Sequence, residues 1–245
     1  MNAMLQIFYM LSWVDFVAML VFVICWVGYS YTLEQGEMGR RGLIGISHEY
    51  RLQWALESAT RDSPITCASL VANLMRSVSF YASTTIYIIA GLFALMGTVD
   101  KIEIFTADLP FARNDDHAFI QIKILLLIVV FITAYFKFTW SLRQFNFLCI
   151  LIGGLTHERN LKDSAQWDRS AKRLARINSF AGNEFNRGIR AYYYGLAAMA
   201  WFINPWLFIC TTLWVTWILY RRDFCSPTIQ VLRDEYPPEV RKLGE

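Results

Sequence analysis

The sequence has little charge for its length. Asp, Glu, Lys and Arg make up 18% of its 245 residues, while 56% of the residues are hydrophobic. Soluble domains carry about 25% charged and about 45–50% apolar residues, so this composition excludes an ordinary soluble catalytic domain. The net charge of +3 is too small to indicate a nucleic-acid partner. The composition therefore predicts an all-α protein that crosses a lipid bilayer.

Residues with metal-binding or catalytic chemistry are also scarce. The three histidines and five cysteines show neither the His-x-x-x-His nor the Cys-x-x-Cys spacing of a metal site. No nucleophile elbow, Walker loop or dinucleotide-binding motif occurs. We expect no metal and no cofactor, and an enzyme is the least supported functional class. If the protein were one, the acid–base candidates would be His48, Glu49, His157 and Glu158.

Positive charge is missing from the N-terminus, since no Lys or Arg occurs in the first 39 residues. A cleaved signal peptide begins with a basic region, so the apolar run at residues 11–31 is predicted to remain as a membrane span. Residues 76–98 and 118–138 are further apolar runs of spanning length. The helical pattern of the last run continues to residue 152, and we expect it to end at Gly153-Gly154.

The final apolar run, residues 191–220, has two interpretations. As one helix its 30 residues would extend about 45 Å, well beyond a hydrocarbon core of about 30 Å. Asn204-Pro205 near its middle is a turn dipeptide that ends or kinks a helix. The run is therefore either one kinked helix, which gives four spans, or a hairpin with a first arm at residues 185–203, which gives five.

The distribution of Lys and Arg favours five spans. Residues 32–72, residues 139–182 and the pair Arg221-Arg222 are basic, whereas the loop at residues 100–116 is acidic. The positive-inside rule then places the N-terminus outside and the C-terminus in the cytoplasm. We predict one polytopic transmembrane helical bundle over residues 1–224, with cytoplasmic segments 32–72 and 139–182 that include amphipathic helices. A loosely ordered cytoplasmic tail follows at residues 225–245.

Two residues of opposite charge fall near the outer ends of predicted spans. Asp15 and Lys123 lie near the outer ends of the first and third spans, which run in the same direction. At similar depth they are expected to form an intramembrane charge pair, because charge in lipid is costly unless paired. The alternative is that Lys123 extends outward and Asp15 lies among the headgroups.

The second predicted span carries a polar stripe at helical spacing. Its members are Asn73, Arg76, Ser77, Phe80, Ser83, Thr84 and Tyr87. Such a stripe suits close helix packing, or the wall of a water-filled path in which Arg76 selects anions. If Arg76 is structural instead, its carboxylate partner would be Glu184, Glu49 or Glu57.

Four bases are predicted at the inner ends of the spans. They form an inner basic ring of Arg76, Lys137, Arg143 and Arg190. The ring would line an inner mouth or bind anionic lipid headgroups at the cytoplasmic face.

Five segments carry a family resemblance. They are residues 76–85 (RSVSFYASTT), 137–146 (KFTWSLRQFN), 187–194 (RGIRAYYY), 200–208 (AWFINPWLF) and 219–223 (LYRRD). Together they resemble the bacterial family catalogued as domain of unknown function 599, over nearly the whole chain. The resemblance implies a bacterial inner-membrane protein. It supplies no activity, and no catalytic or ligand residue can be carried over from it.

Three functional hypotheses follow. The stripe and the basic ring favour a homo-oligomeric channel or transporter for a small ion or solute. The first alternative is a structural or accessory subunit whose polar residues hold helices together. The second is a membrane-embedded enzyme acting on a lipid or quinone. Five spans are few for a monomeric carrier and no inverted repeat is visible, so transport would require an oligomer.

Overall fold

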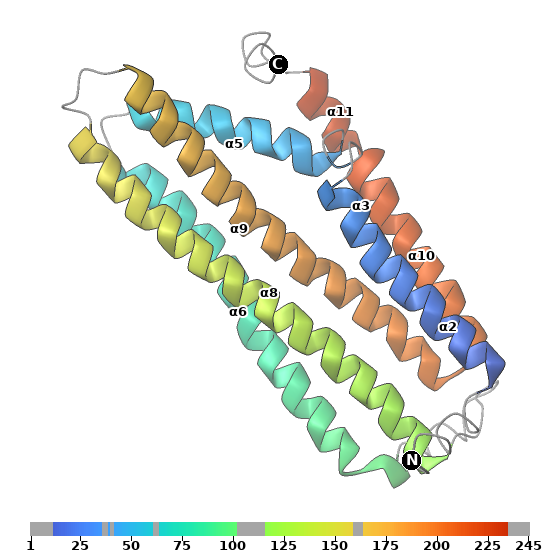
Figure 1. Cartoon of the computed structure of the whole chain (residues 1–245). Helices are drawn as coiled ribbons and strands as arrows, with labels where there is room; N and C mark the ends of the chain where they lie inside the picture. The colour runs from blue at the N-terminus through green and yellow to red at the C-terminus, as the bar shows by residue number, and fades with distance from the viewer. Residues whose placement is uncertain are drawn as a thin grey trace. The chain divides into compact units, whose positions relative to one another are not determined.

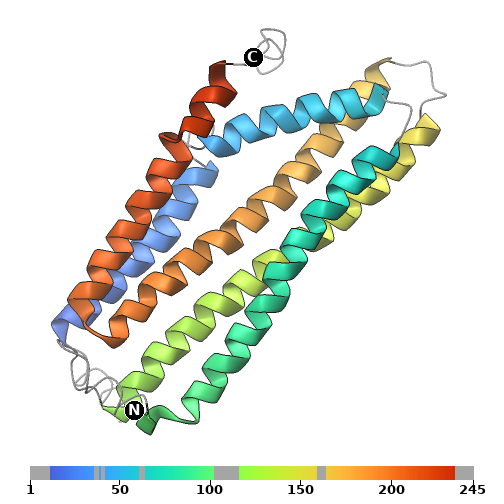
Figure 2. The ribbon, with the colours of Figure 1, turned by 180° about the vertical axis from the view of Figure 1, so that it is seen from behind.

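The computed structural model describes residues 12–35, 39, 42–60, 64–101, 116–158 and 164–234. These residues form helices and a few turns, and no strand occurs among them. The prediction of an all-α fold is therefore confirmed. Figures 1 and 2 show the helices from two opposite sides.

The chain forms two compact units. The first consists of Met1–Tyr31, Ser83–Tyr135 and Gly188–Leu219. The second consists of Thr32–Ala82, Phe136–Arg187 and Tyr220–Glu245. The chain passes from one unit to the other five times, after residues 31, 82, 135, 187 and 219. Among the helices that contribute to both units are α6 (Pro64–Met96), α8 (His117–Glu158) and α9 (Ser164–Met199).

The first unit begins with a helix that contains a π-helical segment. Helix α2 (Trp13–Val23) starts after Ser12 and leads into the π segment Ile24–Gly28, from which α3 (Tyr29–Gln35) continues. A π-helix bonds i to i+5 and so interrupts the regular α ladder. The hydroxyl of Tyr194 on α9 donates to the carbonyl oxygen of Cys25 inside this segment at 3.0 Å. The irregularity therefore provides a contact point between two helices.

The chain reverses direction at Asn204-Pro205. Helix α9 ends at Met199, a 3-10 turn covers Ala200–Phe202, and α10 (Pro205–Phe224) follows (Figure 1). The hydroxyl oxygens of Tyr194 and Thr216 are 3.0 Å apart although the residues are 22 positions apart. A continuous helix would separate them by about 33 Å. This part of the chain is therefore a hairpin, as the second interpretation expected.

The second unit contains a helix where the tail was expected to be loosely ordered. Helix α11 (Pro227–Asp234) contacts α5 (Leu43–Thr60). The Tyr50 hydroxyl donates to the carbonyl oxygen of Leu232 at 2.8 Å, and Ile229 is buried. The expectation is wrong for residues 227–234, because α11 buries an apolar side chain and is held by a side-chain hydrogen bond. Residues 235–245 lie outside the described part.

Helices α6 and α8 are longer than predicted. Helix α6 starts at Pro64, a residue type that suits the first helical position, and not near residue 76. Helix α8 runs to Glu158 and does not end at Gly153-Gly154. A Cβ at either glycine would meet open space, so no tight turn requires them. A helical glycine costs about 1 kcal/mol relative to Ala, which is too little to stop a long helix.

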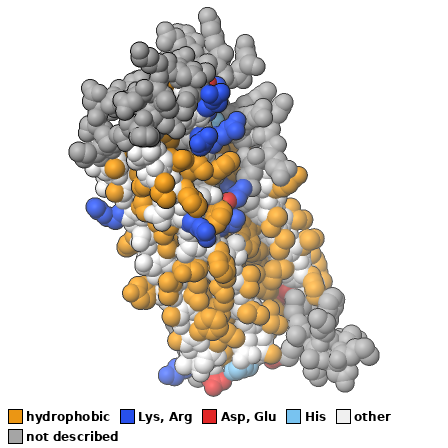
Figure 3. All heavy atoms as spheres, turned by 60° about the vertical axis from the view of Figure 1, so that its left-hand side comes forward, with side chains coloured by type: hydrophobic (Ala, Val, Ile, Leu, Met, Phe, Trp, Pro, Cys, Tyr) orange, Lys and Arg blue, Asp and Glu red, His pale blue; other side chains and the backbone are white. Residues whose placement is uncertain are grey.

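Three helical stretches are long and apolar enough to cross a bilayer. They are Trp13–Leu33, Thr66–Met96 and His117–Gly154. Hydrophobic side chains gather on the face shown in Figure 3. Over the described residues as a whole, large exposed apolar side chains include Leu20, Tyr87 and Phe136. These features are compatible with a membrane location. The number of spans stays a prediction.

Candidate functional site

Two opposite charges are buried around one tryptophan in the first unit. Asp15 on α2 is 0% exposed and Lys123 on α8 is 2% exposed. Trp201 Nε1 donates to Asp15 Oδ1 at 3.0 Å, and Lys123 Nζ donates to the Trp201 carbonyl oxygen at 2.7 Å. We call Asp15, Lys123 and Trp201 the buried charge cluster. Asp15 and Lys123, which were predicted to form a charge pair, thus both contact Trp201.

Aromatic rings complete the surroundings of Lys123. Its Nζ lies 4.7 Å from the centroid of the Phe119 ring and 5.8 Å from that of Phe202. Ring faces attract cations, most strongly when water is excluded. Lys123 therefore does not extend outward to headgroups, and that alternative is wrong. A direct contact between Asp15 and Lys123 stays a prediction.

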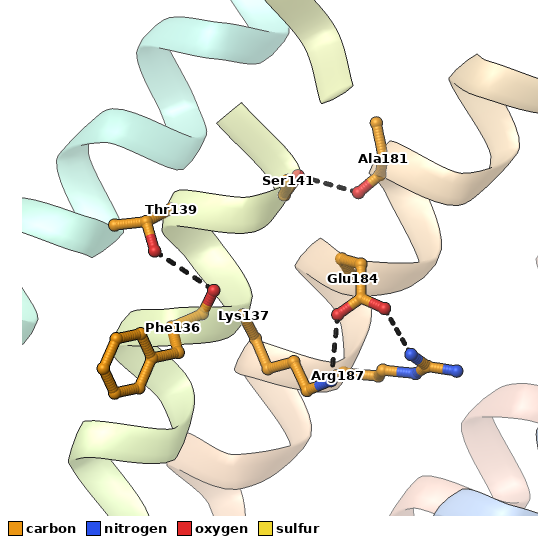
Figure 4. Close-up of polar contacts among 7 residues, drawn as sticks. All are labelled: Phe136, Lys137, Thr139, Ser141, Ala181, Glu184 and Arg187. Atoms are coloured by element: carbon orange, nitrogen blue, oxygen red, sulfur yellow. Dashed lines mark hydrogen bonds and ion pairs between the residues drawn. The ribbon is translucent and has the colours of Figure 1, made fainter. Parts of the chain in front are cut away.

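A second cluster of charge lies between α8 and α9 in the second unit (Figure 4). Glu184 Oε2 is 3.1 Å from Lys137 Nζ, and Glu184 Oε1 accepts a hydrogen bond from Arg187 Nη1. Beside them, Ser141 Oγ donates to the Ala181 carbonyl oxygen at 2.7 Å. We call Glu184, Lys137 and Arg187 the Glu184 cluster. The Glu184 carboxylate therefore binds Lys137 and Arg187, and not Arg76.

The predicted stripe lies on the surface of a single copy of α6. Asn73, Arg76, Ser77, Phe80, Ser83 and Tyr87 are exposed, and Thr84 is half-buried. Arg76 makes no hydrogen bond or ion pair with the described part of the chain. In a single chain the stripe is thus a mostly exposed face of one helix. Whether it faces lipid, water or another copy stays a prediction.

The inner basic ring is not assembled within one unit. Arg76, Lys137 and Arg143 belong to the second unit, whereas Arg190 belongs to the first. Lys137 is paired with Glu184, and the Arg143 guanidinium carbon lies 5.8 Å from the centroid of the Trp140 ring. Arg190 is buried. The ring as a whole stays a prediction, and its four members have different surroundings.

Helix α5 carries two of the four candidate acid–base residues, His48 and Glu49. His48 Nδ1 and Ser179 Oγ are 2.7 Å apart. Burial lowers the pKa of His48, and the positive charges of Arg51 and Arg176 lower it further. Burial also raises the pKa of Glu49. Ser179 is buried, so the contact joins α5 to α9 inside the second unit. The side chains of His157 and Glu158 lie outside the described residues.

The sequence prediction missed Trp201 and Thr85. Trp201 contacts both Asp15 and Lys123, and this depends on the chain reversal that follows it. Thr85 is fully buried, and its Oγ1 lies 2.7 Å from the Tyr192 hydroxyl oxygen. The spacing of the sequence could have indicated the burial of Thr85, because Val71, Val78 and Thr85 recur every seven residues and form the buried face of α6.

A family model matches most of the chain. The family described as "Protein of unknown function, DUF599" has a model that matches residues 17–228 of the chain. The chain belongs to this family. The resemblance read from five segments is therefore confirmed, and the DUF599 match includes Lys123, Trp201 and the Glu184 cluster, while Asp15 lies just before it. No curated protein and no solved structure matches the chain.

Proposed function

We propose that the chain is a multi-span bacterial inner-membrane protein that assembles from identical copies into a channel or transporter for a small ion or solute. The observation that carries this proposal is the polar stripe on α6. Membership of the DUF599 family and the three apolar helical stretches support the membrane part of the proposal. The stripe supports the oligomeric part.

The two faces of α6 are opposite in character. One buries Val71, Val78 and Thr85 against the same chain. The other presents Asn73, Arg76 and Ser83 at its surface, within a stretch apolar enough to span a bilayer. Polar and ionisable side chains that face lipid are expensive, and in membrane proteins they face other helices or water. A neighbouring copy or a water-filled path beside α6 would satisfy them.

The proposed topology has five spans, with the N-terminus outside. The five passages of the chain between its two units support it. The second unit holds both basic segments and Arg221-Arg222, and the first holds the acidic loop and Asn204-Pro205. Reporter fusions after Leu5, Asp108 and Glu245 test this arrangement. An external signal from the Glu245 fusion would contradict it.

A structural or accessory role is the second candidate function. Both charged clusters are bound by residues of their own unit, through Trp201 in one and through Lys137 and Arg187 in the other. Polar groups satisfied in this way act as contacts that hold helices together. Under this role the protein would carry no flux, although the α6 face would still bind another protein.

Oligomeric state and flux together test the proposal. The full chain should be an oligomer in nanodiscs and should conduct ions in liposomes. Ser83→Leu should weaken assembly or block flux, because it places a bulky apolar side chain on the stripe. Cys210→Leu is the matched control, since it adds similar bulk at an exposed position of α10. A monomer without flux would refute the channel, and an oligomer without flux would favour the accessory role.

A further inference from the structure

The second unit contains a pocket that neither charged cluster occupies. Its volume is about 480 Å³, and α5, α6, α8 and α9 all contribute to its wall. Ligand pockets generally fall between about 300 and 1,000 Å³ and combine an apolar wall with a few polar groups. The size is therefore suited to one small molecule or to the polar end of a larger one.

The pocket has an arginine with unused hydrogen-bonding capacity. Arg51 Nη1 is enclosed by protein and has no hydrogen-bond partner among the described residues. Gly182 on α9 makes room for this guanidinium, because a Cβ at that position would overlap Arg51 Nη2. An enclosed hydrogen-bond donor without a partner is costly. Arg51 Nη1 is therefore available to donate a hydrogen bond to a bound anion.

The other polar groups of the wall are neutral. They are Trp54, Asn73, Ser77, Asn178 and Asn186, and no Asp or Glu is among the described residues of the wall. Carboxamides and hydroxyls donate hydrogen bonds, and arginine binds phosphate oxygens through paired donors. A wall with one cation, several neutral donors and no carboxylate favours an oxyanion such as a phosphate group.

The rest of the wall is apolar and reaches the surface of α6. Leu70 and Leu74 line the pocket and remain 48% and 46% exposed. Both lie in the stretch Thr66–Met96, which is apolar enough to span a bilayer. A ligand whose anionic end meets Arg51 would pass these leucines on its way out. The part of the ligand that lies beside Leu70 and Leu74 must therefore be a hydrocarbon chain.

We propose that this pocket binds one anionic membrane phospholipid, with its phosphate on Arg51 and an acyl chain leaving along Leu70 and Leu74. Asn178 and Asn186 orient the headgroup by hydrogen bonds. The site requires only that the chain lie in a membrane, so a failure of the flux test above would leave it unaffected.

Thermal unfolding of the full chain in detergent tests the site. Phosphatidylglycerol should raise the melting temperature of the wild type, while phosphatidylcholine and inorganic phosphate should not. Arg51→Gln should weaken the apparent affinity for phosphatidylglycerol at least about tenfold, because it removes charge-assisted hydrogen bonds. Arg173→Gln is the matched control, because it removes an exposed arginine of the same unit that does not line the pocket and should leave the lipid effect intact.

Other outcomes would overturn the proposal. Equal stabilisation of the wild type and Arg51→Gln by phosphatidylglycerol would show that Arg51 does not hold the headgroup. Stabilisation by inorganic phosphate alone would indicate a soluble anion, and an equal effect of phosphatidylcholine would indicate nonspecific lipid. If Arg51→Gln does not fold, Ser77→Phe decides, because it fills the pocket from its exposed rim and keeps Arg51. A lipid effect that survives Ser77→Phe would exclude this pocket.

Discussion

The two charged clusters contain the same kinds of charge in different surroundings. In the first unit Asp15 and Lys123 are fully buried, and a single tryptophan binds both. In the second unit the Glu184 side chain is 11% exposed, while those of Lys137 and Arg187 are 36% and 28% exposed. Water can therefore compensate for a lost partner in the Glu184 cluster but not in the buried charge cluster. Enclosure, more than the number of partners, should set how much each cluster contributes to stability.

The largest loss of stability is expected for Lys123→Met. It leaves the Asp15 carboxylate buried without the cation, so we expect a loss of about 3–5 kcal/mol in the free energy of unfolding. Lys101→Met, at an exposed lysine of the same unit, should have little effect. The measurement is thermal unfolding in detergent.

The double variant Asp15→Asn with Lys123→Met sharpens the same point. It removes both charges, so it should be more stable than Lys123→Met alone. If Lys123→Met and Lys101→Met unfold alike, enclosure does not govern the first cluster.

Glu184→Gln should have a smaller effect. It leaves Lys137 and Arg187 without their carboxylate, but both are partly solvated, so we expect a loss of about 1–2 kcal/mol. Asp168→Asn is the control on the same helix, because its pair with Lys172 at 2.7 Å is about half exposed and is worth about 0.5 kcal/mol. Denaturant titration of both variants measures the difference, and equal losses would contradict the ranking.

His48 adds a pH dependence to the second unit. Its pKa in the folded chain is below the value of about 6.5 in an unfolded chain. The unfolded state therefore binds more protons between these two values. Stability should be unaffected by His48 above pH 6.5 and should decrease as the pH falls toward the folded pKa. Melting temperatures measured across this range should decrease less in His48→Gln.

Ser179→Ala separates the causes of this pH dependence. It removes the hydroxyl contact but keeps the burial and the two arginines, which are what lower the pKa of His48. The dependence should therefore persist in Ser179→Ala. Its disappearance would assign the effect to the hydrogen bond.

The smallest effect is expected for Arg76→Gln. Arg76 is exposed, and Glu184 is bound by Lys137 and Arg187, so the free energy of unfolding should change by less than about 0.5 kcal/mol. Changed flux or ion preference in a stable variant would support the channel. A strongly destabilised variant would mean that Arg76 has a structural partner outside the single chain.

Local sequence signals predicted the helices and the hairpin. They failed where a contact depends on residues far apart in the sequence. Asn204-Pro205 marks the reversal because proline cannot continue the helix before it. The end of α8 was predicted wrongly from Gly153-Gly154, because glycine weakens a helix without ending it. Depth along two helices predicted that Asp15 and Lys123 lie near each other, and both side chains contact Trp201. Trp201, their common partner, could not be found in this way, because its contacts require three helices to meet.

The π-helical segment Ile24–Gly28 also limits what can be inferred from periodicity. A hydrophobic pattern read at 3.6 residues per turn loses phase across such a segment. The faces assigned to residues 13–23 therefore do not extend unchanged to residues 29–35. A chain one residue shorter here could form an uninterrupted α-helix with the same flanking faces. In an alignment of relatives, residues 24–28 are thus where a single-residue gap would leave the packing on both sides in register.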